Sequence, residues 1–246
     1  MKVLLVYPNL QMVALLPSNI AIMAASLKKA GVNVRLFDTT LYRIAEKSVD
    51  DVRVEHMQLR PFNLKEKGVD YKDSDVFEDF ERTVAEFRPD IIGISIGDDT
   101  FDLGIALVSR VKRPDIHVIL GGVYPTFSPD EAIRNEYVDS ICIGEGEHAL
   151  VELCQKMQKK EDITGIRNLW VKHNDVIHKN GVRELVDINE LPYEDFDVFE
   201  EKRFFRPMQG KIFRMIPVTI DRGCPYNCSF CAAPLQRKFY SDAGQG

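Results

Sequence analysis

The strongest constraint on the fold is a regular alternation of short apolar runs with segments of helical spacing. The runs of strand character lie at residues 3–7, 32–37, 91–96, 117–120 and 140–143. Apolar residues recur at helical spacing over residues 18–30, 77–87, 101–112, 129–135 and 145–159. Continuously apolar strands that alternate with amphipathic helices are typical of a mostly parallel sheet covered by helices.

The first helix carries the expected local signals. Ser18 precedes the apolar residues as the expected N-cap, lysines lie in the last turn, and Gly31 follows as the expected C-terminal stop. This helix and the strands on either side form a β-α-β unit. Repetition of the unit predicts an α/β, Rossmann-like (flavodoxin-like) domain over residues 1–160, with helices on both faces of the sheet and a ligand at the carboxyl ends of the strands. Residues 39–75, of mixed charge, are expected to be irregular.

The rest of the chain divides into two further parts. Residues 161–200 are predicted to be a hairpin and linker, because residues 168–179 alternate apolar and polar around an Asn-Asp turn and an acidic stretch follows. Residues 201–246 begin a second unit, in which an apolar strand at residues 213–220 leads directly into a cysteine-rich loop.

Composition narrows the class of protein. The chain of 246 residues is 45% hydrophobic, enough for a globular core, and its formal net charge of -6 makes nucleic acid an unfavourable partner. No apolar stretch is long enough to predict a membrane span, and Pro8, Asn9 and Gln11 interrupt the opening segment where a signal peptide is continuously apolar. Three of the five cysteines lie within eight positions, which favours metal ligation in a reducing compartment and therefore the cytoplasm.

The cysteine-rich loop has the pattern of a metal site. Cys224, Cys228 and Cys231 stand as Cys-x3-Cys-x2-Cys in a loop with Gly223 and Pro225. Three thiolates can hold three corners of an iron-sulfur cube and leave the fourth iron open to a small molecule. The alternative is structural zinc, which needs a fourth ligand, although no Cys or His follows the third cysteine. The other two cysteines, Cys142 and Cys154, are predicted to be buried core residues.

The segment CPYNCSFC resembles the cluster-binding motif of the radical S-adenosylmethionine (SAM) superfamily, including the aromatic Phe230. The resemblance implies a 4Fe-4S cluster on Cys224, Cys228 and Cys231 whose open iron is chelated by SAM. It also implies reductive cleavage of SAM to a 5'-deoxyadenosyl radical, with Phe230 beside the adenine. Residues 201–246 would then be the first strand and cluster loop of a partial β/α barrel.

The preceding domain carries a second resemblance. The segments GGVYPTFSPDEAI and VDSICIGEGEHALVEL resemble the cobalamin-binding domain found before many radical SAM modules. The resemblance implies a set of cobalamin contacts, namely Ser95, Gly121, Gly122, Gly144, Glu145 and Gly146. Glycines at strand ends would let the backbone approach a bulky ligand, although the same glycines could serve only tight turns.

Departures from related sequences limit these expectations. The loop after the first strand lacks the Asp-x-His-x-x-Gly that supplies a cobalt-ligating histidine in other cobalamin proteins. We expect no such ligand from this loop, and we expect His148 to be a surface residue. The dinucleotide fingerprint G-x-G-x-x-G is also absent, which disfavours nicotinamide binding.

Together these features predict the front part of a cobalamin-dependent radical SAM enzyme. The expected reaction is methyl transfer to, or rearrangement of, an unactivated carbon of a small-molecule substrate, with an electron donor such as flavodoxin or ferredoxin. No catalytic residue is assigned. Because only the first barrel strand is expected here, the chain should be a fragment without full catalysis. Two alternatives stay open: a stand-alone cobalamin carrier with a vestigial cluster loop, and a zinc-binding interaction module.

Overall fold

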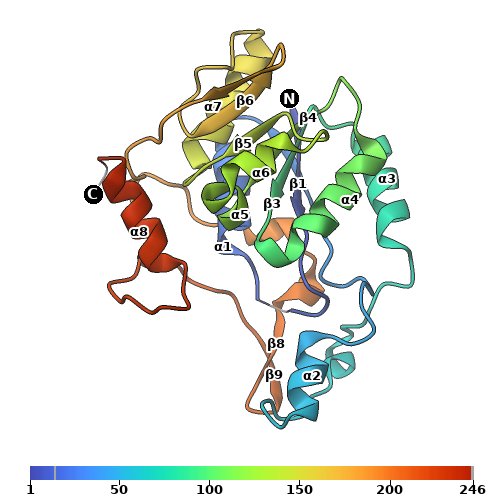
Figure 1. The fold of residues 1–246 in the computed structure, drawn as a ribbon. Helices are drawn as coiled ribbons and strands as arrows, with labels where there is room; N and C mark the ends of the chain where they lie inside the picture. The colour runs from blue at the N-terminus through green and yellow to red at the C-terminus, as the bar shows by residue number, and fades with distance from the viewer. Residues whose placement is uncertain (14, 245–246) are drawn as a thin grey trace.

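A computed structural model describes residues 1–13 and 15–244 of the chain. Its main sheet has the strand order β2-β1-β3-β4-β5-β6-β7 (Figure 1). The strands are β1 (Lys2–Tyr7), β2 (Asn33–Asp38), β3 (Ile91–Ser95), β4 (His117–Gly121), β5 (Ser140–Cys142), β6 (Leu169–His173) and β7 (Val176–Lys179). The strands β1 to β5 are parallel and β6 and β7 are antiparallel. The order 2-1-3-4-5 of the parallel strands is that of flavodoxin-like folds, so the predicted fold class is confirmed.

Helices cover both faces of the sheet. The first face carries α1 (Ser18–Lys29) and α7 (Glu147–Lys159), which pack against each other and against alternate strand residues such as Leu5. The opposite face carries α3 (Val76–Phe87), α4 (Phe101–Val111), α5 (Val123–Phe127) and α6 (Pro129–Arg134), packed against strand residues such as Val6. The central strands are therefore buried on both sides, which explains why they read as continuous apolar runs.

Two local expectations for the first 75 residues need correction. Ser18 is the first residue of α1 and not its N-cap, because Pro17 takes the extended cap conformation and its carbonyl accepts the first intrahelical hydrogen bonds. The segment 39–75 is more regular than predicted, since it contains α2 (Val49–Glu55) and a 3-10 helix, η1 (Leu64–Lys67). The side chains of Ser48 and Asp51 cap α2 reciprocally, a signal that the mixed charge of the segment concealed.

Two other local expectations are confirmed. Gly31 follows α1 with a φ of 78°, the left-handed conformation of a helix stop. The hairpin predicted at residues 168–179 is β6-β7, whose turn residues Asn174 and Asp175 both have positive φ. Because β6 pairs with β5, this hairpin extends the parallel sheet with two antiparallel strands.

The strand predicted at residues 213–220 does not form as expected. The chain instead has a small separate hairpin, β8 (Phe205–Met208) with β9 (Lys211–Arg214), which packs against the segment that contains η1 (Figure 1). Pairing ends after Met215, because the residues just before β8, which would have to pair next, form the 3-10 helix η4 (Glu201–Phe204). Residues 216–220 then run without a neighbouring strand towards the last helix, α8 (Ala233–Asp242). Within the described ranges, no helix has both the length and the apolar character that a membrane span requires.

Candidate cofactor cavity

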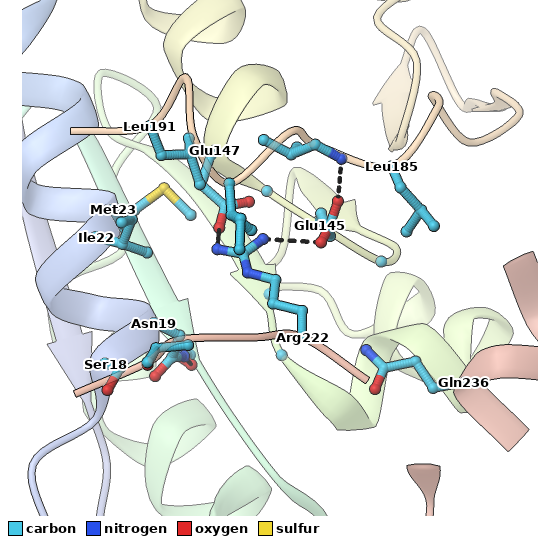
Figure 2. Close-up of a pocket in the computed structure, with 18 of the residues that line it drawn as sticks. Ser18, Asn19, Ile22, Met23, Glu145, Glu147, Leu185, Leu191, Arg222 and Gln236 are labelled. Atoms are coloured by element: carbon cyan, nitrogen blue, oxygen red, sulfur yellow. Dashed lines mark hydrogen bonds and ion pairs between the residues drawn. The ribbon is translucent and has the colours of Figure 1, made fainter. Parts of the chain in front are cut away.

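A cavity of about 1280 Å³ lies at the carboxyl ends of the central strands. Its floor includes residues of β3 and β4, and its walls include the first turns of α1 and the loop 185–194. Residues 219–225 and α8 line the remaining side, so segments far apart in sequence meet there (Figure 2). The chain reverses its direction of winding between β1 and β3, and this switch point is where open α/β sheets bind ligands.

Glycines keep part of the floor bare of side chains. A Cβ at Gly121 would meet nothing closer than 3.9 Å, and a Cβ at Gly93 nothing closer than 3.5 Å. Both glycines line the cavity, so their missing side chains leave room for a ligand. Gly93 was missed in the sequence, because a single glycine inside an apolar strand carries little signal.

Gly122, another predicted contact, has a different reason to be glycine. Its φ is 106°, and a Cβ there would lie 2.4 Å from the carbonyl oxygen of Ile96. The tight turn after β4 therefore requires glycine whether or not a ligand is bound.

The predicted residue Ser95 lies on the cavity wall at the end of β3. Asn19, from the first turn of α1, donates a hydrogen bond from Nδ2 to Ser95 Oγ over 2.8 Å. Both residues line the cavity together with Ser18, and α1 has no side-chain N-cap. The first N–H groups of a helix lack intrahelical partners, so this end of α1 offers donors suited to an anionic ligand. Asn19 could not be identified as a cavity residue from sequence, because only its place next to the expected cap distinguishes it.

The Gly144–Glu147 turn contacts the C-terminal part of the chain. Arg222 reaches Glu145 Oε1 over 2.8 Å and Glu147 Oε1 over 2.5 Å, as Figure 2 shows. Glu145 Oε2 also accepts a hydrogen bond from the backbone N–H of Val186 over 2.7 Å. The predicted contact Glu145 is thus occupied by groups of this chain, and neither Arg222 nor its two partners could be paired from sequence spacing.

A second C-terminal residue, Tyr240, contacts the same turn. Its hydroxyl oxygen accepts a hydrogen bond from the backbone N–H of Glu145 over 2.7 Å. A Cβ at Gly144 would lie 2.4 Å from that oxygen, so only glycine leaves room for the tyrosine. Gly146, the remaining predicted contact, faces Met23 of α1, whose Cε would lie 3.0 Å from an added Cβ. Gly144 thus leaves room for Tyr240, and both Gly144 and Gly146 also line the cavity, so their contact with cobalamin stays a prediction.

The electrostatics of the turn favour these contacts. Burial opposes the charge of Arg222, but the charges and hydrogen bonds of Glu147 and Glu145 outweigh it and raise the pKa of the guanidinium. Burial also raises the pKa of Tyr240, so its hydroxyl stays neutral. The guanidinium of Arg222 therefore stays charged, and the neutral tyrosine adds no negative charge beside the two glutamates.

The three motif cysteines lie in the loop between Arg222 and α8. Cys224 is half-buried and lines the cavity, whereas Cys228 and Cys231 are exposed. Arg237 of α8 donates a hydrogen bond to the carbonyl oxygen of Cys224 over 2.8 Å and also contacts the side chain of Asn227. Thiolates are suitable ligands for iron-sulfur clusters. Within residues 1–13 and 15–244, however, no three His, Cys, Asp or Glu side chains are gathered closely enough to hold a metal ion.

The remaining residues singled out in the sequence are either exposed or buried in the core, and Cys142 of the core also lines the cavity floor. Phe230 is 91% exposed, and His148 lies at the surface as expected. Cys142 and Cys154 are buried, which confirms them as core residues, and burial raises the pKa of each thiol to about 12. None of the histidines in the described part of the chain lines the cavity.

Comparison with known proteins relates the domain to a defined family. The family model of the B12 binding domain matches residues 14–154. An uncharacterized methyltransferase of Pyrococcus horikoshii is 29% identical over 164 residues, 65% of this chain and 35% of the relative. The anaerobic magnesium-protoporphyrin IX monomethyl ester cyclase of Rubrivivax gelatinosus is 28% identical over 185 residues, 71% of this chain and 32% of the relative. The chain thus spans about a third of the length of these two proteins.

Solved structures share the fold. The radical SAM methyltransferase TsrM from Kitasatospora setae, solved with cobalamin and a [4Fe-4S] cluster bound, superposes with a TM-score of 0.59 at 18% identity. The match covers 95% of this chain and 41% of TsrM. The cobalamin-dependent radical SAM enzyme OxsB, solved with aqua-cobalamin and SAM bound, gives a TM-score of 0.56 at 19% identity and covers 80% of this chain and 24% of OxsB.

Proposed function

The chain belongs to the B12-binding domain family, and on this premise we propose that its cavity binds cobalamin as part of a radical SAM enzyme. The observation that carries the proposal is the cavity of about 1280 Å³ at the switch point of the sheet, with Gly93 and Gly121 on its floor. Pockets for ordinary small ligands measure roughly 300–1,000 Å³, so this space suits a larger cofactor such as a corrinoid.

The cavity residues fit the parts of cobalamin. We assign the bare surface at Gly121 to the bulky corrin, because an added side chain there would occupy the cavity and not the protein core. The start of α1, with Ser18 and Asn19, supplies N–H and polar groups for the phosphate of the nucleotide tail. Ser95, held by Asn19, would donate a hydrogen bond to the same tail.

The cysteine loop is assigned to the SAM half of the reaction. Cys224, Cys228 and Cys231 would hold a 4Fe-4S cluster, which when bound supplies the electron for reductive cleavage of SAM. Cys224 already lines the cavity, so a cluster on this loop would lie beside the bound corrinoid. Phe230, exposed in the same loop, is free to reach the adenine of SAM.

The reaction proposed for the whole protein is methyl transfer to, or rearrangement of, an unactivated carbon in a small molecule. The relatives include a methyltransferase and a cyclase, so the proposal is not confined to methyl transfer. An electron donor such as flavodoxin or ferredoxin would reduce the cluster, and a reducing compartment such as the cytoplasm would protect its thiolates.

Titration with hydroxocobalamin tests the first half of the proposal. The chain should retain the corrinoid through gel filtration, with a shift of its visible absorption bands. Gly121→Leu should weaken binding at least about tenfold, because the new side chain fills the cavity. Gly165→Leu is the matched control, since Gly165 lies at the surface with open space around it. A chain that does not retain hydroxocobalamin would overturn the proposed function.

Anaerobic reconstitution with iron and sulfide tests the second half. The reduced protein should give an electron paramagnetic resonance signal that changes when SAM is added. A variant with Cys224, Cys228 and Cys231 all replaced by serine should lose that signal and its iron. A cobalamin-binding chain without a cluster would support the carrier alternative, and a chain that purifies with stoichiometric zinc on these thiols would support the interaction module.

A further inference from the structure

Two residues that bracket the cysteine loop end at one short turn of the α/β domain. Arg222 lies just before the loop and binds Glu145 and Glu147, whereas Tyr240 lies after it and binds the backbone of Glu145. In sequence these partners are separated by 75 to 95 residues. Contacts from both ends of one loop to a single turn fix where that loop can lie.

The turn has the charge and shape to receive these two groups. Glu145 and Glu147 place two carboxylates side by side, and Glu147 Oε2 is buried with no hydrogen-bond partner. Without a cation, the burial and mutual repulsion of these charges would be costly. A guanidinium can reach both carboxylates at once through separate nitrogens, which a single ammonium group does less well.

The tyrosine contact adds a requirement of shape. The absence of a Cβ at Gly144 leaves the space that the Tyr240 hydroxyl occupies. Arg237, also on α8, holds the carbonyl of Cys224, so the helix is tied both to the turn and to the cysteine loop.

Apolar contacts hold only the far end of this part of the chain, where Tyr240 and Phe239 of α8 pack against the core of the α/β domain. Ile216, Val218 and Ile220, which lead to the loop, are exposed apolar residues without a strand partner. On the side where residues 216–222 lead to Cys224, the position of the loop therefore depends on the ion pairs that Arg222 makes at the Gly144–Glu147 turn.

We infer that the Gly144–Glu147 turn is the docking site of the cysteine loop, and that Arg222 is a positioning residue that holds the loop over the cavity. The purpose of this docking rests on the proposed function, since it would keep the cluster close to the corrinoid. The docking itself is independent of any cofactor and can be measured without one.

A distance measurement between two nitroxide spin labels tests the docking. One label is placed on Cys228 and the other on an introduced cysteine, Ser109→Cys, at an exposed position of α4, with Cys224 and Cys231 replaced by serine. The buried Cys142 and Cys154 have raised pKa values and should escape labelling. Pulsed dipolar spectroscopy of the full chain without cofactors should then give one main distance peak.

Substitution of Arg222 should remove that peak. Arg222→Ala should give a broad distance distribution. Arg222→Lys should keep the peak in part, because lysine retains the positive charge but lacks the separate nitrogens with which a guanidinium reaches both carboxylates. Arg214→Ala is the matched control: Arg214 lies in the same part of the chain and pairs with Glu201, but both side chains are exposed. It should leave the peak unchanged.

Each outcome of the measurement decides the inference. An unchanged peak in Arg222→Ala, or a broad distribution before any substitution, would overturn it. If Arg222→Ala fails to fold, Glu147→Gln decides: it weakens the same ion pair and should also broaden the distribution, whereas an unchanged peak would refute the docking. Hydroxocobalamin is added afterwards. Loss of the peak in Arg222→Ala in a protein that never binds cobalamin would leave the docking intact and refute the proposed function.

Discussion

The floor of the cavity is made of paired, buried strands, whereas the cysteine segment, residues 215–232, is attached by polar contacts. Ile94 and Ile119 of the floor are almost fully buried, but Val218 and Ile220 of the cysteine segment are 74% and 85% exposed. Backbone pairing and apolar burial hold the floor over its whole length. The cysteine segment has no such continuous support.

This difference separates two kinds of mutational effect. Changes in the floor or in its buried attachments should alter the free energy of unfolding, because many atoms lose their contacts together. Changes in the exposed loop should alter its position or its metal binding while the free energy of unfolding stays the same. The predictions below test that separation, from the largest expected effect to the smallest.

Arg203 should give the largest loss of stability, because it joins the 3-10 helix η4 to the sheet through a buried ion pair. Its side chain is only 2% exposed, and its Nε lies 2.7 Å from Asp38 Oδ2 at the end of β2. Arg203→Ala leaves Asp38 partly buried without its partner, which should lower the free energy of unfolding by about 3–5 kcal/mol. Urea denaturation of the whole chain measures this difference.

The exposed pair Arg214–Glu201 is the control for that experiment. Arg214→Ala should leave the free energy of unfolding nearly unchanged, because solvent screens both side chains. Similar losses for Arg203→Ala and Arg214→Ala would mean that burial does not distinguish the two attachments.

The adjacent glycines of the floor should respond very differently to alanine. In Gly122→Ala the Cβ would overlap the Ile96 carbonyl oxygen at 2.4 Å, in a conformation with a φ of 106°. We therefore expect the free energy of unfolding to fall by about 2–4 kcal/mol. In Gly121→Ala the Cβ would make only ordinary van der Waals contacts, at 3.9 Å, and should lower the free energy of unfolding by less than about 1 kcal/mol. Thermal denaturation followed by circular dichroism measures both. A large loss in Gly121→Ala would show that this glycine is structural.

The two regions also differed in how far the sequence predicted them. The fold class, the helix stop at Gly31 and the hairpin β6-β7 were predicted correctly, because each depends on residues close together in the chain. The strand at 213–220 was not, because a strand also requires a partner, and the chain before Phe205 is helical.

For the site, too, the features that depend on local sequence could be predicted and the contacts between distant residues could not. Gly121 and Ser95 could be placed at strand ends from sequence, and both line the cavity. The pairing of Arg222 with Glu145 and Glu147 joins residues 75 or more positions apart, and local patterns carry no information about such contacts. Gly144, Glu145 and Gly146 were predicted to contact a cofactor, and all three line the cavity. Their contacts with the chain's own Tyr240 and Arg222 could not be predicted, because glycines and carboxylates look alike in sequence whether they face a ligand or the protein.

A partly buried histidine, His117, at the opposite end of the sheet should make the stability of the domain depend on pH. Burial lowers the pKa of His117 from 6.5 to about 4, with Asp139 and Lys112 as the neighbouring charges. Its Nε2 lies 2.8 Å from Ser140 Oγ. Because the unfolded chain binds the proton more tightly, stability should be full above pH 6.5 and fall by about 1–3 kcal/mol towards pH 4.

Urea denaturation at several pH values measures this dependence. His117→Gln should reduce the slope between pH 6.5 and 4, since glutamine cannot take up the proton. His148→Gln is the control, because His148 is exposed, and it should leave the slope unchanged. Equal slopes in the parent protein and His117→Gln would contradict the prediction.

The three motif cysteines should give the smallest change in stability of any residues considered. With metal removed by a chelator, replacing Cys224, Cys228 and Cys231 together by serine should change the free energy of unfolding by less than about 0.5 kcal/mol, because two of them are exposed and one is half-buried. Cys142→Ser is the contrast, since the new hydroxyl would be buried in the cavity floor and should cost about 1–3 kcal/mol. If the triple variant loses as much free energy of unfolding as Cys142→Ser, the thiols stabilise the loop even without metal. The cysteine segment would then contribute to stability as the cavity floor does, and the proposed difference between the two regions would be wrong.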